Sequence, residues 1–108
     1  MRMNKYEEKF KAGTNGMHNL EYEDMSCLIS LPTADVRDEV LWVSIEKVLD
    51  KTQSLEIKLS RTQRYEIIKR VSAAMRLEGH KGIYTNEFKL VEVDIKNIDY
   101  SSDILEIE

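Results

Sequence analysis

Apolar residues in the second half of the chain recur at helical spacing and predict one amphipathic helix. The buried stripe of this helix comprises Ile67, Ile68, Val71, Ala74 and Met75. Intervals of three and four residues place these side chains on one face. Ser60 and Gln63 match a capping box, in which each side chain satisfies a free backbone N–H of the other residue. Gly79 is a natural helix end, so we predict a helix that begins at Ser60 and stops at Gly79.

A second helix is predicted over residues 34–52, directly after Pro32, which is expected to end a strand. Its first apolar stripe comprises Leu41, Ile45, Val48 and Leu49, with Trp42 at its edge. A second stripe, on roughly the opposite side, comprises Val36, Val40 and Val43. A surface helix needs only one apolar stripe. The valine stripe is therefore either buried between two layers or an interface with a second copy or another protein.

Other apolar patterns predict strands. Residues 20–31 alternate with a period of two, and residues 83–95 carry apolar side chains on both faces, as a central strand does. Residues 98–100 and 104–107 predict a further strand and an acidic edge. Residues 54–59 fit a short edge strand or extended linker, which we favour, or a continued helix. Residues 4–12, with Tyr6 and Phe10 four apart, predict a short helix before a turn at 13–16.

These elements predict an α+β fold: a mixed or antiparallel sheet of three or four strands with two main helices packed on it. One domain is expected over residues 1–108, with a short helix and turn at 1–16 and an acidic edge strand or tail at 101–108. The chain has 108 residues, of which 42% are hydrophobic and 33% charged. This composition fits one globular domain with a highly charged surface.

The cysteine count and the hydropathy of the sequence indicate the cellular compartment in which the protein is expected. Cys27 is the only cysteine, so an intrachain disulfide is excluded. No apolar run approaches the roughly 18 residues of a membrane helix, and the charged first residues lack the apolar stretch of a signal peptide. We therefore expect a cytoplasmic protein that does not bind membranes.

Charge is distributed unevenly along the chain. The net charge is −4, but residues 60–81 carry 6 basic and 2 acidic side chains, whereas residues 82–108 carry 2 basic and 7 acidic ones. A protein that binds nucleic acid with its whole surface is usually basic overall. The balance therefore disfavours that class and leaves a local basic face as the candidate.

That basic face lies on the predicted helix 60–81 and comprises Tyr65, Lys69, Ser72 and Arg76. An aromatic ring between cations can stack on a base and contact phosphate. Helix surfaces carry lysine and arginine routinely, so a solvated face is the favoured interpretation. A third interpretation is that the face meets an acidic protein or the chain's own acidic end.

Acidic side chains suggest no catalytic or metal site. Glu39, Glu46 and Asp50 form a ridge on the predicted helix 34–52. This ridge is either solvated or part of a protein interface, in which its carboxylates mimic phosphates and occupy a partner's nucleic-acid groove. Neither His18 nor His80 has a cysteine or carboxylate at ligand spacing, and Cys27 is expected to be buried. We predict no catalytic residues, no cofactor and no metal.

The sequence thus favours a non-enzymatic protein-binding module: an inhibitor, adaptor or regulator of a nucleic-acid-handling assembly. Small acidic proteins of this profile are common among phage and mobile-element products, including anti-CRISPR-type inhibitors, although this is an association by profile and not by motif. The expected partner is another protein or a second copy in a homodimer. The alternative is a nucleic-acid-binding module that uses the basic helix 60–81.

Overall fold

Strands are the main secondary structure of the described residues, and one long helix packs on them. The computed structural model describes residues 4–6, 10–14, 19–24, 27–37, 39–45, 47–50 and 55–98. Its elements are β1 (Asn4–Tyr6), β2 (Phe10–Thr14), β3 (Asn19–Asp24), β4 (Cys27–Arg37), β5 (Val40–Val43), β6 (Lys47–Asp50), α1 (Arg61–Leu77), β7 (Gly82–Thr85), β8 (Lys89–Val91) and a 3-10 helix, η1 (Ile95–Asn97). The predicted α+β class is confirmed. A second main helix is not found among the described residues.

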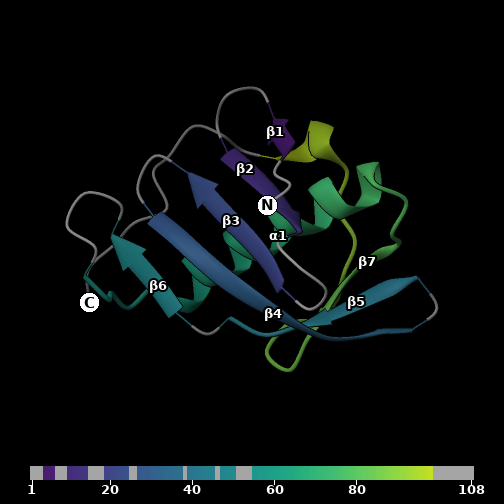
Figure 1. Ribbon diagram of the computed structural model, residues 1–108. Helices are drawn as coiled ribbons and strands as arrows, with labels where there is room; N and C mark the ends of the chain where they lie inside the picture. The colour runs from purple at the N-terminus through teal and green to yellow at the C-terminus, as the bar shows by residue number, and fades with distance from the viewer. Residues whose placement is uncertain are drawn as a thin grey trace.

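The long strand β4 connects the strands into one curved layer. The order of pairing is β1–β2–β3–β4–β5–β7–β8, with β6 also beside β4. Figure 1 shows β4 crossing the molecule with β6 beside one end and β5 beside the other. The described pairings are antiparallel except for β5 with β7, which are parallel. The layer is therefore mixed, one of the two predicted alternatives.

The predicted helix over residues 34–52 is wrong, because the described residues of this range form the end of β4 and the strands β5 and β6, which both pair with β4. Arg37 lies opposite Val40, and Cys27 lies opposite Asp50. The ladder is interrupted after β5, where residues 44–45 belong to no strand. Valine is frequent in this region, and its branched side chain favours extended chain. Glu39 supplies the positive φ, 67°, that the tight turn requires.

Pro32 does not end a strand as predicted but lies within β4, opposite Asn19 of β3. A proline has no backbone N–H to donate, so the interior of a paired strand rarely accommodates one. Thr33 pairs with Val43 and Ser30 with Lys47, which puts the interruption between β5 and β6 opposite residues 31–32. The ladder is therefore already broken where the proline stands.

Residues 20–31 form two strands, β3 and β4, where one was predicted. The buried positions are Leu20, Tyr22 and Asp24 on β3, and Cys27, Ile29 and Leu31 on β4. The buried side thus changes from even to odd positions, which a single regular strand cannot do. The Asp24 carboxylate accepts a hydrogen bond of 3.0 Å from the backbone N–H of Cys27. This bond bridges the turn between the two strands.

The N-terminal residues form strands where a short helix was predicted. Tyr6 lies opposite Phe10 across β1 and β2, so their spacing of four residues reflects two facing strand positions. In β2, Phe10 and Ala12 are buried and Lys11 is exposed, a period of two. Gly13 and Thr14 of the predicted turn belong to β2. Residues 15–16 and 99–108, with the strand expected at 104–107 and the tail at 101–108, lie outside the described residues.

The prediction is confirmed for the segment 55–59 and wrong for the segment 83–95. Residues 55–59 are extended, as favoured: Glu56 bridges to Leu49, and the N–H of Ile57 donates to the carbonyl of Val48 at 3.0 Å. The predicted single strand over 83–95 is wrong, because β7 and β8 are joined by a turn at 86–88. Lys89 has a φ of 58° there, which matches a short hairpin loop that ends in a left-handed residue.

The helix α1 is buried on a broad face, with eight of its 17 residues buried, because the strands curve around it. The predicted stripe is confirmed, since Ile67, Ile68, Val71, Ala74 and Met75 are all fully buried. Arg70, Ser72 and Ala73 are buried as well. The helix contacts β2, β7, β8 and η1, and Figure 1 shows it behind the strands β2 to β4. The core therefore lies between α1 and the concave side of the strand layer.

The predicted capping box is present at the start of α1. Ser60 is the N-cap, and its hydroxyl accepts a hydrogen bond of 3.2 Å from the backbone N–H of Gln63. The Gln63 side-chain oxygen in turn accepts one of 3.0 Å from the backbone N–H of Ser60. At the other end Gly79 has a φ of 98°, the left-handed conformation that terminates a helix.

Replacement of Ser60 by alanine is expected to destabilise the protein by about 1 kcal/mol, because the N–H of Gln63 loses its partner. Urea denaturation of Ser60→Ala and wild type measures the difference. Thr62→Ala is the matched control: Thr62 is exposed in the same turn, so its effect should stay within about 0.5 kcal/mol. Equal midpoints for Ser60→Ala and Thr62→Ala would contradict a stabilising role of the cap.

Candidate functional site

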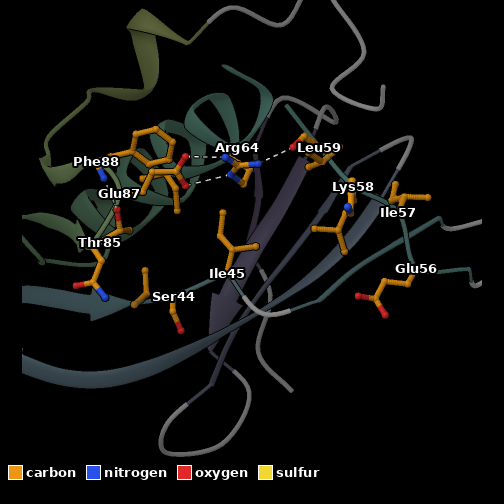
Figure 2. Close-up of a pocket in the computed structure, with 14 residues that line it drawn as sticks. Ser44, Ile45, Glu56, Ile57, Lys58, Leu59, Arg64, Thr85, Glu87 and Phe88 are labelled. Carbon is orange, nitrogen blue, oxygen red and sulfur yellow. Dashed lines mark hydrogen bonds and ion pairs between the residues drawn. The ribbon is translucent and has the colours of Figure 1, made fainter. Parts of the chain in front are cut away.

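A pocket of about 480 Å³ lies beside the interruption between β5 and β6. Five segments line it: the end of β5 with residues 44–45, Val48 of β6, the extended residues 56–59, the first turns of α1, and the β7–β8 turn. Figure 2 shows Ile45 between these segments, with Arg64 and Glu87 on one side and Lys58 on the other. The volume lies within the range of ligand pockets, roughly 300–1,000 Å³.

The wall of the pocket is largely apolar and continuous with the core. Its apolar lining residues are Val43, Ile45, Val48, Ile57, Leu59, Ile68 and Phe88. Ile45, Ile57 and Phe88 are only partly buried and pack against the core cluster, whereas Leu59 and Ile68 belong to the core itself. An apolar group that entered the pocket would therefore replace water against core side chains, which contributes about 0.8 kcal/mol for each CH₂ buried.

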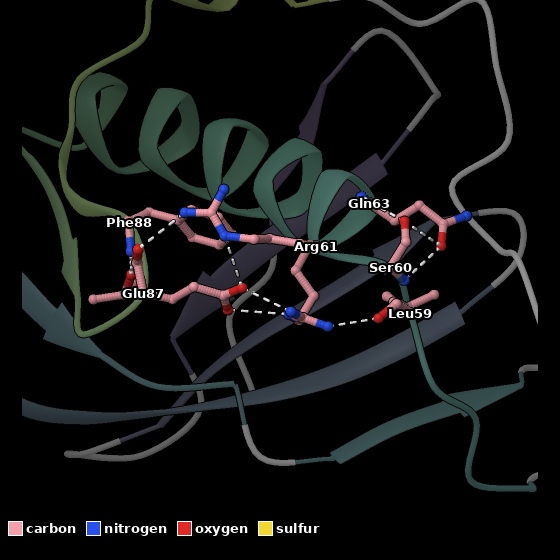
Figure 3. Close-up of polar contacts among 8 residues, drawn as sticks. Leu59, Ser60, Arg61, Gln63, Glu87 and Phe88 are labelled. Carbon is pink, nitrogen blue, oxygen red and sulfur yellow. Dashed lines mark hydrogen bonds and ion pairs between the residues drawn. The ribbon is translucent and has the colours of Figure 1, made fainter. Parts of the chain in front are cut away.

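A bidentate ion pair stands at the rim. The Arg64 guanidinium donates to both carboxylate oxygens of Glu87, with Nε–Oε2 at 3.0 Å and Nη2–Oε1 at 2.7 Å. Its Nη1 donates to the carbonyl oxygen of Leu59. Arg61 approaches the same carboxylate, at 3.4 Å from Nε to Oε1. Figure 3 shows Glu87 beside Arg61 of the first helical turn.

These arginines determine the charge state of Glu87. The hydrogen bonds from Arg64 lower the pKa of the Glu87 carboxyl below its usual value, with further electrostatic contributions from Arg64 and Arg61. Glu87 is therefore ionised near neutral pH and a poor proton donor. The described residues that line the pocket include no histidine and no cysteine. The arrangement suits recognition of an apolar group beside a charge more than proton transfer.

Phe88 fixes the turn that carries Glu87. Its backbone N–H donates to the Thr85 hydroxyl at 2.8 Å. Its ring lies under the Arg61 guanidinium, 4.9 Å from the ring centroid, and 5.0 Å from the ring of Tyr65. The turn is thus attached to α1 by both an ion pair and aromatic contacts. Sequence reasoning missed this site, because residues 83–95 were taken as one strand and the turn was not expected.

The predicted basic face of α1 is partly neutralised within the chain. Lys69 forms an ion pair of 2.6 Å with Glu66, and its ammonium lies 5.0 Å from the ring centroid of Tyr65. Tyr65 is 38% exposed and touches Phe88. Tyr65 and Lys69 thus lie together, as predicted, near the pocket rim. Whether they bind nucleic acid stays a prediction.

The other two residues of that face lie in different environments. Ser72 is fully buried and donates a hydrogen bond of 2.7 Å to the carbonyl of Val91, so its hydroxyl is not on the surface. Arg76 forms ion pairs with Asp94 at 3.2 Å and Glu92 at 3.9 Å. The contacts of Arg76 match the interpretation in which the basic face meets the chain's own acidic end.

The valine stripe and the acidic ridge were predicted on a helix that is not found among the described residues. Val40 and Val43 are buried, with 9% and 5% of their surface exposed, whereas Val36 of β4 is 52% exposed. The three valines therefore do not form one face. Glu39 is exposed in the β4–β5 turn and Asp50 lies in β6. Glu46 lies outside the described residues. Glu39 and Asp50 thus belong to different elements, and the described part of the chain holds no helix that would align them.

A second surface, absent from the sequence analysis, lies on the strands. Trp42, Tyr84 and Leu90 follow one another across β5, β7 and β8. The rings of Trp42 and Tyr84 stack with centroids 4.0 Å apart, and Leu90 is 43% exposed. Both aromatic side chains are half-buried. Trp42 was placed at the edge of a helical stripe, so its strand neighbour was not foreseen.

A buried polar network, also missed, ties α1 to the strands. The Tyr22 hydroxyl donates to Asp24 at 2.6 Å and accepts a hydrogen bond of 2.9 Å from Arg70. Arg70 and Asp24 also form an ion pair at 3.7 Å. Burial, followed by the charge of Asp24, raises the pKa of the Tyr22 hydroxyl. The network therefore holds a neutral tyrosine between two buried charged side chains.

Residues that suggested chemistry at the sequence level do not converge. Cys27 is buried in β4, as expected, and His80 follows the end of α1. Groups of three or more histidine, cysteine or carboxylate side chains able to hold a metal ion are not found among the described residues. His18 lies outside them. In the same part of the chain, no helix has the length and apolar character needed to cross a membrane.

Comparison with protein-family models, with curated proteins and with solved structures finds no match for this chain. Its function is therefore argued from the geometry of its own residues.

Proposed function

We propose that the protein is a non-enzymatic protein-binding module whose pocket receives an apolar side chain of its partner. The observation that carries this proposal is the pocket of about 480 Å³ with core side chains in its wall and charged groups at its rim. Binding hot spots in protein interfaces have this form: an apolar anchor in a desolvated pocket, surrounded by polar contacts.

The state of the polar groups supports binding over catalysis. Arg64 and Glu87 are ion-paired with each other, and the Thr85 hydroxyl accepts the N–H of Phe88. A general acid or base needs a pKa near the working pH, whereas the pKa of Glu87 is lowered. An inhibitor, adaptor or regulator needs no such group. The half-exposed row of Trp42, Tyr84 and Leu90 adds a second surface of the composition found in interfaces.

A random-peptide display selection tests the proposal. Wild-type protein is the target, and Ile45→Arg, which places a charge in the pocket, is the counter-target. Ile45 is only partly buried, so the variant should keep the fold, which NMR shift dispersion checks. We expect peptides that share an apolar residue and bind Ile45→Arg at least about tenfold more weakly, a change of 1.4 kcal/mol.

A parallel titration tests the alternative function, the binding of nucleic acid. Single- and double-stranded DNA and RNA are added at low and physiological salt to wild type and to Lys69→Glu/Arg76→Glu. Phosphate binding releases counterions and weakens steeply with salt. Sub-micromolar affinity at physiological salt that the double substitution abolishes, together with no pocket-dependent peptides, would replace the protein-binding module by the nucleic-acid module.

A further inference from the structure

We infer that the pocket recognises an apolar side chain next to a carboxylate, and that this carboxylate takes the place of Glu87 on Arg64. The inference rests on the proposed function and names the chemistry of the partner segment. Inside the chain, Glu87 already shows what the arginine binds: a carboxylate seated bidentately at the rim, 2.7 Å and 3.0 Å from the guanidinium.

Charge at the rim favours an incoming anion on this side of the pocket. Arg64 and Arg61 share the single carboxylate of Glu87. Lys58 also lines the pocket, is exposed, and has no ion pair with the described residues. Three cations, Arg61, Arg64 and Lys58, thus stand in or beside a pocket that holds two carboxylates, Glu87 and Glu56. The cations are concentrated on the side of Arg64, where an incoming carboxylate would be attracted. The planar guanidinium of Arg64 suits a carboxylate because its N–H groups match the two oxygens.

The exchange is feasible because Glu87 is replaceable. Its side chain is 34% exposed and stands in a surface turn, so a released carboxylate is hydrated again at once. Exposed ion pairs contribute little net stability. The backbone of the turn is held independently, by the Phe88 N–H on Thr85 and by the Phe88 ring under Arg61. Glu87 can therefore leave Arg64 while the pocket wall remains in place.

The apolar part of the ligand and its carboxylate must be close together. Ile45 and Phe88 line the same pocket as Arg64, and Figure 2 shows the Arg64–Glu87 pair facing the space above Ile45. A side chain that packs on Ile45 and Ile57 would place a neighbouring carboxylate at the rim. In a peptide this corresponds to an apolar residue beside an aspartate or glutamate, or to an apolar C-terminal residue.

Three small probes that share one apolar group test the inference. The probes are 4-phenylbutyrate, 4-phenylbutanol and 4-phenylbutylamine, and binding is followed by amide chemical-shift changes of the full chain. We expect 4-phenylbutyrate to shift the signals of Ile45, Ile57 and Phe88 and to bind about tenfold more tightly than the alcohol. That ratio corresponds to one charge-assisted hydrogen-bonded contact. The amine should bind most weakly.

Substitutions show whether 4-phenylbutyrate competes with Glu87 for Arg64 or responds only to the net charge of the pocket. Glu87→Gln removes the internal carboxylate and should tighten 4-phenylbutyrate binding about tenfold. Glu56→Gln, on the opposite wall, removes the same charge without freeing Arg64 and should change affinity by less than about twofold. Arg64→Gln should abolish the preference for the acid over the alcohol. If that variant fails to fold, Arg61→Gln, which leaves the Leu59 contact intact, should reduce the same preference.

Two results would overturn the inference. Equal affinities of all three probes for the pocket would show that no carboxylate is selected, while leaving the apolar pocket and the protein-binding module in place. Shifts confined to other surfaces would show that the pocket does not accept the apolar group. In that case the peptide selection against Ile45→Arg decides separately whether the proposed function also fails.

Discussion

Arg70→Met is expected to destabilise the protein by about 3–5 kcal/mol, the cost of removing one partner from a buried ion pair. Arg70 is 4% exposed and Asp24 7% exposed. The methionine fills most of the space of the arginine stem but leaves the Asp24 carboxylate buried without its cation, and the Tyr22 hydroxyl loses a donor. Urea denaturation followed by the fluorescence of Trp42 measures the loss.

Two comparisons decide whether the buried charge is the cause. Arg76→Met removes an arginine of the same helix whose side chain is 37% exposed, and its cost should stay below about 1 kcal/mol. Adding Asp24→Asn to Arg70→Met removes the buried negative charge and should recover part of the loss. If Arg70→Met costs no more than Arg76→Met, the network does not hold the helix to the strands.

Val43→Asp is expected to unfold the protein or destabilise it by more than about 3 kcal/mol, whereas Val36→Asp should change stability by less than about 0.5 kcal/mol. Val43 is 5% exposed and belongs to the core cluster, while Val36 is 52% exposed near the hairpin end. A carboxylate at position 43 would be buried without a partner. Thermal denaturation by circular dichroism compares the two variants.

This pair of substitutions also separates the strand from the helix predicted for residues 34–52. On a helix, positions 36 and 43 are seven apart and share a face, so the two aspartates would have similar effects. In the hairpin, Val36 and Val43 belong to different strands, β4 and β5. Equal effects of Val36→Asp and Val43→Asp would contradict the hairpin.

The sequence predicted α1 well because its local signals agree. The capping box, the stripe of Ile67 to Met75 and the terminal Gly79 each indicate the same helix. The hairpin of β4 with β5 lacked such signals. Its turn contains Glu39 at a positive φ in place of the glycine or asparagine typical of tight hairpins. Val40, Leu41 and Val43 are all buried, so the strand showed no polar–apolar alternation that would have excluded a helix.

The candidate site was less predictable than the fold. Its walls come from residues 43–45, 48, 56–59, 64, 68 and 85–88, which become neighbours only through the pairing of strands far apart in sequence. Arg64 and Glu87 are unremarkable as sequence positions, since no motif connects them.

For the fold, the sequence contained one signal that the prediction did not use. The apolar positions change from even numbers, at Leu20 and Tyr22, to odd numbers, at Cys27 and Ile29, and the buried positions follow the same change. This change marks the β3–β4 turn.

The parallel pairing of β5 with β7 has a consequence for the growing chain. β5 meets β4 across a turn of two residues, but its other neighbour, β7, follows only after α1, with Val40 opposite Gly82. Contacts between positions so far apart in sequence form late in folding, because closing the loop between them costs conformational entropy. During synthesis from the N-terminus, the hairpin of β4 and β5 therefore emerges before the helix and strand that cover Leu41 and Val43. Until α1 and β7 have emerged, Leu41 and Val43 remain uncovered. The nascent chain is then most prone to aggregate or to bind chaperones.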